Sequence, residues 1–320
     1  MVKSKPVYAF EEADSKNRML LGGKGAGLSE MTRLKLPVPS GFTITTEVCN
    51  KYYDNDRKLS KDVMPQVMKN IAKMEKKTGK KWNSTKNPLL VSVRSGAAIS
   101  MPGMMDTILN LGLNEKTVEG FAQQTKNPRF SWDSYRRFIQ LFGKVVFGVN
   151  DEKFDHVLDS AKNKQGVTDD SKLSVESLKK IVSEYKKICE KHTKRKFPDT
   201  PNEQLGLAIE AVFKSWMGER AVVYREKNGI TKDIANGTAV NVVTMVFGNM
   251  GDDSATGVVF TRNGSDGKRE IEGEYLINAQ GEDVVAGVRT GKNVDLLKKE
   301  MPKSYKELSN ACTKLAKHFR

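Results

Sequence analysis

An arginine among small residues is the clearest candidate for chemistry in this sequence. It lies in the segment 92–112, SVRSGAAISMPGMMDTILNLG, after the apolar run 88–91, which is typical of a buried strand. Arg94 is expected at the end of that strand, followed by Ser95, Gly96 and two alanines. A cation beside residues that let the backbone approach a ligand suits an anion such as phosphate. An arginine paired with a structural carboxylate, beside a methionine-rich core, fits the same residues equally well.

A glycine-rich segment around Lys24 is a second candidate. Residues 20–28 read LLGGKGAGL and precede a helix expected through Leu28 and Met31. Backbone amides at a helix N-terminus can hold a phosphate, which a nearby lysine would neutralise. The segment lacks the GxxxxGK[ST] order and the dinucleotide-binding fingerprint, so a glycine-rich turn with an incidental lysine is the alternative.

Two further pairs of charged residues could each have either of two roles. Arg136 and Arg137 are adjacent, so only one can share the apolar face of their helix. The other is either a second phosphate ligand or part of a surface salt bridge. Glu282 and Asp283 follow an expected strand, where they could orient a metal–nucleotide complex or cap the next element.

The elements that must position these residues change in type along the chain, which predicts an α+β fold. Ser60 is expected to cap a helix that Gly79 ends. Strands are expected at 7–10, 42–46, 107–113, 238–247, 256–261 and 274–278. Other helices are expected at 131–147, 178–189, 205–216 and 308–319, and residues 114–199 are expected to form a helical subdomain.

Composition indicates a folded chain of two or three subdomains without a membrane span. The chain has 320 residues, of which 38% are hydrophobic and 29% charged. Apolar runs are too short to cross a membrane, and the first residues lack a signal-peptide core. Its 3 cysteines are far apart, which favours free thiols in a cytoplasmic protein.

The net charge of +15 raises the question of nucleic-acid binding. Lysines are spread over expected helix faces and mixed with glutamates, and no zinc-ligand spacing or RNA-binding aromatic motif accompanies them. These features argue against a nucleic-acid partner.

Several long motifs resemble the N-terminal nucleotide-binding domain of the pyruvate phosphate dikinase family. They are LLGGKGAGLSEM at 20–31, PVPSGFTITTE at 37–47, VSVRSGAAISMPGMMDTILNLGLN at 91–114, NPRFSWDSYRRFIQ at 127–140, TMVFGN at 244–249 and GEYLINAQGEDVVAGVRT at 273–290. The related phosphoenolpyruvate synthases share the lysine and arginine motifs, but the SMPGMMDT loop favours the dikinase.

The resemblance implies an ATP-grasp fold and a phosphotransferase with paired acceptors. It places one α+β lobe at 1–113 with 200–246, a helical insertion at 114–199 and a β-rich lobe at 247–320. The reaction implied converts ATP, phosphate and pyruvate to AMP, pyrophosphate and phosphoenolpyruvate, with Mg²⁺ accompanying ATP. A histidine of a central domain takes the phosphoryl group in this cleft and carries it to a pyruvate-binding domain.

The resemblance also implies roles for individual residues. Lys24 and Arg94 would bind the ATP phosphates and act in catalysis. Gly103 and Met105 would belong to a loop that covers the nucleotide. The remaining ATP-binding residues carried over by position are Arg137, Thr256, Gly257, Glu282 and Asp283, with Thr256 and Gly257 in a phosphate-facing turn.

Three departures from the family pattern argue against full catalysis by this chain alone. The acidic segment that holds Mg²⁺ is expected beyond Arg320, as are the phosphohistidine and pyruvate-binding domains. Val243 replaces a glutamine that commonly lies beside the adenine. A non-catalytic nucleotide-binding or regulatory homologue is therefore the alternative, and apolar surface left uncovered would allow a homodimer.

Overall fold

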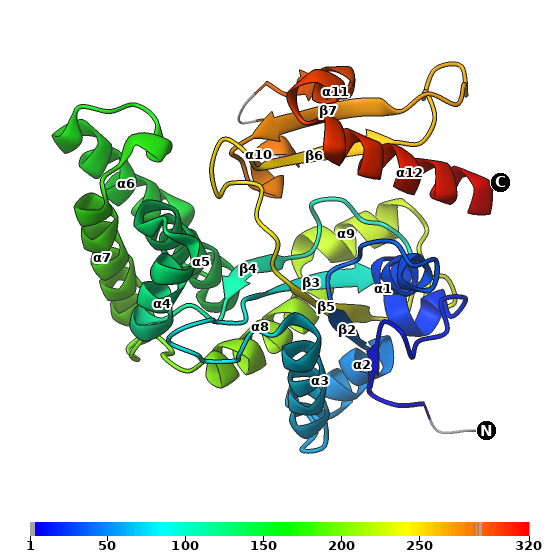
Figure 1. The fold of residues 1–320 in the computed structure, drawn as a ribbon. Coiled ribbons are helices and arrows are strands. Elements are labelled where there is room, and N and C mark those ends of the chain that lie inside the picture. The colour runs from blue at the N-terminus through cyan, green and yellow to red at the C-terminus, as the bar shows by residue number, and fades with distance from the viewer. Residues whose placement is uncertain (1–3, 286, 288–289, 320) are drawn as a thin grey trace. The chain divides into compact units, whose positions relative to one another are not determined.

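A computed structural model describes residues 4–285, 287 and 290–319 (Figure 1). The chain divides into two compact units, Met1–Met245 and Val246–Arg320. Both combine helices with antiparallel sheet, so the predicted α+β class is confirmed. No helix among the described residues is both long and apolar enough to span a membrane.

The first unit contains a five-stranded antiparallel sheet and nine α-helices among its described residues. The strands are β1 Val7–Ala9, β2 Gly41–Ile44, β3 Val91–Ala97, β4 Thr107–Leu111 and β5 Thr238–Thr244. The helices are α1 Arg18–Arg33, α2 Thr46–Asp54, α3 Val63–Thr78, α4 Glu115–Thr125, α5 Pro128–Phe147, α6 Asp151–Gln165, α7 Val175–Thr193, α8 Pro201–Trp216 and α9 Glu219–Lys227, with the short 3₁₀ helix η1 Asp170–Lys172.

The sheet has the order β1-β2-β5-β3-β4 and two different faces. Successive side chains of a strand point to opposite faces. Val93 and Val242 are opposite each other in the register and fully buried, as expected of an apolar face. Arg94 is opposite Asn241, which is opposite Thr43, and this polar row lies on the face that meets α1.

The expected helical segment between β4 and α8 has an aromatic core. Phe138 and Phe142 of α5 pack on Phe197, with ring centroids 6.1 and 5.4 Å apart. Phe154 of α6 meets Tyr185 of α7 at 4.8 Å. All five side chains are buried, so this segment holds a core of its own beside the sheet.

The second unit is a three-stranded antiparallel sheet with helices and a small core. Its strands are β6 Ala255–Phe260, β7 Glu272–Ile277 and β8 Lys292–Asn293, in that order. Its helices are α10 Gly281–Val285, α11 Leu297–Glu300 and α12 Pro302–His318, with the 3₁₀ helix η2 Val294–Leu296. Leu276, Ala279 and Val284 form a buried cluster in it.

Several local predictions need correction. Arg94 lies in the middle of β3, because the β-ladder with β5 continues through the small residues to Ala97. The N-cap of α3 is Asp62, and Ser60 instead accepts a hydrogen bond from the Val63 amide through its carbonyl. Thr256 and Gly257 lie within β6 and form no turn. Gly79, in contrast, ends α3 in the left-handed conformation, as predicted.

Candidate functional site

Lys24 and Arg94 are brought together on one face of the first sheet. The glycine-rich segment belongs to α1, which is interrupted at Gly22 (φ 68°, ψ 165°), so a second helical stretch starts just before Lys24. The Lys24 ammonium donates a hydrogen bond to the Ser95 carbonyl at 2.9 Å. Since Ser95 follows Arg94 on β3, two cations far apart in sequence lie side by side.

Close packing explains why α1 needs glycines where it crosses the sheet. A Cβ at Gly22 would lie 1.8 Å from the Gly96 carbonyl oxygen, and one at Gly25 would lie 2.8 Å from the Thr43 hydroxyl. A Cβ at Gly96 would be 3.2 Å from the Lys24 Cβ. The glycines therefore let α1 approach β2, β3 and β5 closely enough for Lys24 to reach β3.

The environment of Lys24 weakens the binding of its proton, although the side chain is still mostly protonated at neutral pH. Lys24 is exposed as a residue, but its ammonium lies against the Ser95 carbonyl and loses hydration there. This burial, followed by repulsion from Arg94, lowers the pKa of Lys24 from 10.5 to about 8. A phosphate group beside the two cations would relieve that repulsion.

Gly103 and Met105 lie on the loop between β3 and β4. Gly103 has φ +73°, and its Cβ position faces open space within 4 Å. Met101 is buried and anchors the start of the turn, whereas Met105 is partly exposed. At the end of the loop, burial raises the pKa of Asp106, although the Arg220 guanidinium 3.7 Å away opposes the shift.

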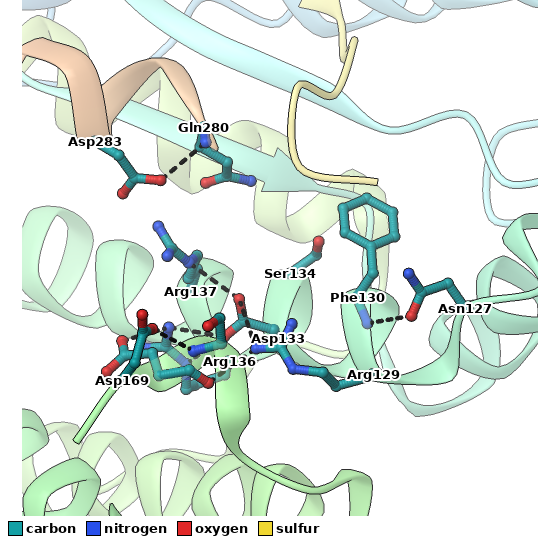
Figure 2. Close-up of polar contacts among 12 residues, drawn as sticks. Asn127, Arg129, Phe130, Asp133, Ser134, Arg136, Arg137, Asp169, Gln280 and Asp283 are labelled. Atoms are coloured by element: carbon teal, nitrogen blue, oxygen red, sulfur yellow. Dashed lines mark hydrogen bonds and ion pairs between the residues drawn. The ribbon is translucent and has the colours of Figure 1, made fainter. Parts of the chain in front are cut away.

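Arg137 belongs to a cluster of arginines around Asp133 on α5 (Figure 2). Its Nε donates to Asp133 Oδ2 at 3.3 Å, and the Nε of Arg136 donates to Oδ1 at 2.8 Å. The Arg129 Nη2 lies 3.9 Å from Asp133 Oδ2. Both adjacent arginines thus form salt bridges to Asp133. The expected surface position is wrong, because the Arg136 and Asp133 side chains are only 3% and 5% exposed.

Asp133 is the residue that sequence reasoning missed. Its spacing to Arg129, Arg136 and Arg137 is four, three and four residues, which places all four side chains on one helical face. That spacing was available in the motif NPRFSWDSYRR and is the signal that could have identified it.

The other candidates lie within the second unit. Thr256 and Gly257 are opposite Leu276 and Tyr275 in the β6–β7 ladder. A Cβ at Gly281 would lie 3.8 Å from the Thr256 hydroxyl, so Thr256 is close to the start of α10. Asp283 accepts a hydrogen bond from the Gln280 amide at 2.9 Å, which is the capping role considered above, and Glu282 lies in the same first turn.

Metal ligands are not grouped in the described part of the chain. No three or more His, Cys, Asp or Glu residues among the described residues lie close enough to hold a metal ion together. Glu282 and Asp283 therefore form a carboxylate pair and no complete metal site.

The chain is similar to one family of known proteins, both by family model and by pairwise identity. The family model described as "Pyruvate phosphate dikinase, AMP/ATP-binding domain" matches residues 18–63 and 55–318. The chain is 52% identical to pyruvate, phosphate dikinase of Clostridium symbiosum over 99% of this chain and 36% of that protein. It is 53% identical to the Entamoeba histolytica protein of that name over 98% of this chain and 36% of that protein.

The similarity extends to plants. Pyruvate, phosphate dikinase 1, chloroplastic, of Arabidopsis thaliana is 47% identical over 100% of this chain and 33% of that protein. The chain therefore spans about a third of the length of these relatives.

Proposed function

Because this chain belongs to the pyruvate phosphate dikinase AMP/ATP-binding domain family, we propose that it binds Mg·ATP through Lys24 and Arg94. The observation that carries the proposal is the pairing of these cations on one sheet face, where Lys24 reaches the Ser95 carbonyl at 2.9 Å. Two adjacent cations repel each other unless an anion lies between them, so the pair is suited to the phosphates of a nucleotide.

The proposed reaction is that of a phosphotransferase with paired acceptors. ATP, phosphate and pyruvate would yield AMP, pyrophosphate and phosphoenolpyruvate in a longer protein. Phosphoryl transfer depends mostly on positioning and charge neutralisation, so Lys24 and Arg94 would hold the phosphates and offset charge as it shifts. Domains that carry the phosphohistidine and bind pyruvate would be the partners of this one.

We assign the architecture to the ATP-grasp type with a helical insertion. The lobes would be residues 1–113 with 200–246 and residues 247–320, and residues 114–199 would form the insertion. The α+β composition of both units and the helical segment with its own aromatic core support this assignment.

The remaining nucleotide contacts are proposed by motif. Gly103 and Met105 would cover the nucleotide, because both lie on the loop between β3 and β4, where Gly103 is exposed and Met105 partly exposed. The other contacts would come from Arg137, Thr256, Gly257, Glu282 and Asp283. Mg²⁺ would enter with ATP and neutralise phosphate charge.

We also propose a cytoplasmic location. All three cysteines are buried, free thiols. A reducing compartment is compatible with that state.

Calorimetric titration of the 320-residue chain with Mg·ATP tests the proposed function. Arg94→Ala should raise Kd about 10- to 100-fold, because it removes a charge-assisted contact to phosphate. Lys69→Ala is the matched control, since it removes one positive charge from an exposed position on α3 and should change Kd less than about twofold. Equal affinity of wild type and Arg94→Ala would exclude Arg94 from the site.

A further inference from the structure

Asn241 of β5 lies beside the cation pair, in the polar row of the first sheet. It is fully buried, and it is opposite Arg94 on one side and Thr43 on the other. Opposite residues of an antiparallel pair have their side chains on the same face of the sheet. The Asn241 side chain therefore shares the face that meets α1 with the Arg94 side chain.

The Thr43 hydroxyl orients the carboxamide of Asn241. It donates a hydrogen bond to Asn241 Oδ1 at 2.9 Å. The amide nitrogen Nδ2 is thereby directed to the other side, where it has no hydrogen-bond acceptor among the described residues. A buried donor without an acceptor destabilises the fold, so stability alone does not explain an asparagine at this position.

The two ends of the carboxamide touch the two glycines at which α1 crosses the sheet. A Cβ at Gly25, the residue after Lys24, would lie 2.9 Å from Oδ1. A Cβ at Gly96, on the strand of Arg94, would lie 2.8 Å from Nδ2 and 3.2 Å from the Lys24 Cβ. The carboxamide is therefore packed between the helix that bears Lys24 and the strand that bears Arg94.

We propose that Asn241 is a positioning residue that sets the distance between Lys24 and Arg94 by acting as a spacer between α1 and β3. The inference rests on the proposed function, because this pair is the one assigned to the ATP phosphates. Two like charges move apart unless the surrounding structure holds them. A spacer in contact with both elements keeps α1 in one position, so the pair is preorganised and loses less entropy when it binds phosphate.

The shape of the carboxamide, rather than its polarity, gives Asn241 this role. Leucine has the same branched shape beyond Cβ, so Asn241→Leu should keep the spacing. Asn241→Ala removes the branched group and leaves a gap between α1 and β3. The two variants therefore separate the spacer from the hydrogen bond to Thr43, which both of them lose.

The pKa of Lys24 in the free protein reports the spacing without ATP. Arg94 is the charged group that acts on Lys24, and together with burial it lowers that pKa to about 8. Asn241→Ala should raise the pKa towards 10.5, because Lys24 can then move away from Arg94 into solvent. Asn241→Leu should keep it near 8. NMR titration measures all three proteins, with the Lys24 signal assigned by its loss in Lys24→Met.

Affinity for Mg·ATP should follow the same order. Asn241→Ala should raise Kd about tenfold, because a displaced cation no longer meets the phosphate, and Asn241→Leu should raise it no more than about threefold. Asn70→Ala is the matched control: it truncates a buried asparagine on α3 and should change Kd less than about twofold.

Two results would overturn the proposal. The first is a wild-type Lys24 pKa and Kd in folded Asn241→Ala, because the side chain would then only stabilise the fold. The second is an equal change in Asn241→Ala and Asn241→Leu, because polarity rather than shape would then be responsible.

A measurement on the unchanged protein covers the case in which Asn241→Ala does not fold. A carboxamide packed between α1 and β3 should be as rigid as the backbone, so the ¹⁵N order parameter of its NH₂ group should be about 0.85, against less than about 0.6 for exposed Asn163 on α6. The Asn241 signal is assigned by its loss in Asn241→Leu. Equal order parameters would overturn the proposal.

These outcomes separate the spacer role from the proposed function. If the wild type binds Mg·ATP but Asn241→Ala keeps the wild-type Kd and Lys24 pKa, only the spacer role is wrong. If the wild type does not bind Mg·ATP while the Lys24 pKa rises in Asn241→Ala, the spacer role holds and the proposed function is wrong.

Discussion

At the scale of single residues, the defining feature is a pair of cations that the sheet and α1 bring side by side. Lys24 and Arg94 are 70 positions apart in the chain, yet Lys24 bonds to the carbonyl next to Arg94. Their mutual repulsion is a cost in the unliganded protein. An anion that binds between them is attracted to both cations and offsets their repulsion, so this electrostatic gain adds to its affinity.

The lowered pKa of Lys24 predicts a pH dependence of ATP binding. In the free protein Lys24 loses its proton as pH rises through about 8, and only the protonated form attracts phosphate. Affinity for Mg·ATP should therefore be constant below about pH 7.5 and fall up to about tenfold per pH unit above pH 8. Calorimetric titrations between pH 7 and 9.5 measure this.

Lys24→Met serves as the control for that dependence. It should bind Mg·ATP weakly at every pH and lose the decline above pH 8. The same decline in Lys24→Met as in the wild type would assign the titration to another group.

At the scale of elements, the glycines of α1 allow this helix to pack closely on the sheet, whether or not they also contact a ligand. The sequence left a phosphate-binding turn and an incidental glycine-rich turn as alternatives. The structure adds a third reason for glycine. Helix α1 passes so close to β3 that neither Gly22 nor Gly96 has room for a side chain. This closeness is also what carries Lys24 to Arg94.

Two glycine substitutions in α1 should have opposite effects on stability. Gly22→Ala introduces a Cβ at φ 68° and 1.8 Å from a backbone oxygen, so it should lower the free energy of unfolding by at least about 2 kcal/mol. Gly27→Ala meets nothing within 4 Å and should raise it by up to about 1 kcal/mol. Urea denaturation followed by circular dichroism measures both, and similar values for the two variants would contradict this account of the packing.

At the scale of the whole molecule, the Gln204 side chain forms hydrogen bonds to both ends of the helical segment 114–199. Gln204 of α8 is fully buried. Its Nε2 donates to the carbonyls of Leu113 and Pro198, both at 3.0 Å, and its Oε1 accepts from the Gly112 amide at 3.1 Å. The start and the end of the segment thus meet at the helix that packs on the sheet.

Gln204→Leu should loosen this junction. The change leaves buried backbone groups without their partner and should lower the free energy of unfolding by about 2–4 kcal/mol in urea denaturation. Gln123→Leu, at an exposed position on α4, is the matched control and should change it by less than about 0.5 kcal/mol. A loss for Gln204→Leu no larger than that of the control would show that the junction does not depend on this side chain.

The sequence by itself determined the α+β class, half of the described α-helices and the family. Apolar residues repeat with helical spacing in a half-buried helix and at every second position in a half-buried strand, so the sequence shows which face of an element is buried. The long motifs are specific enough to identify the family. The residues Lys24 and Arg94 could be selected for the same reason, since their flanking glycines and alanines are a local feature.

Only the tertiary structure decided which of these residues meet and how each is held. Arg94 lies within β3 because pairing with β5 extends the strand, and that pairing involves residues almost 150 positions away. The reach of Lys24 to Ser95 and the bonds of Gln204 are likewise long-range contacts, which local pattern does not encode. The Asp133 cluster is the exception, because its helical spacing is local and was open to prediction from sequence.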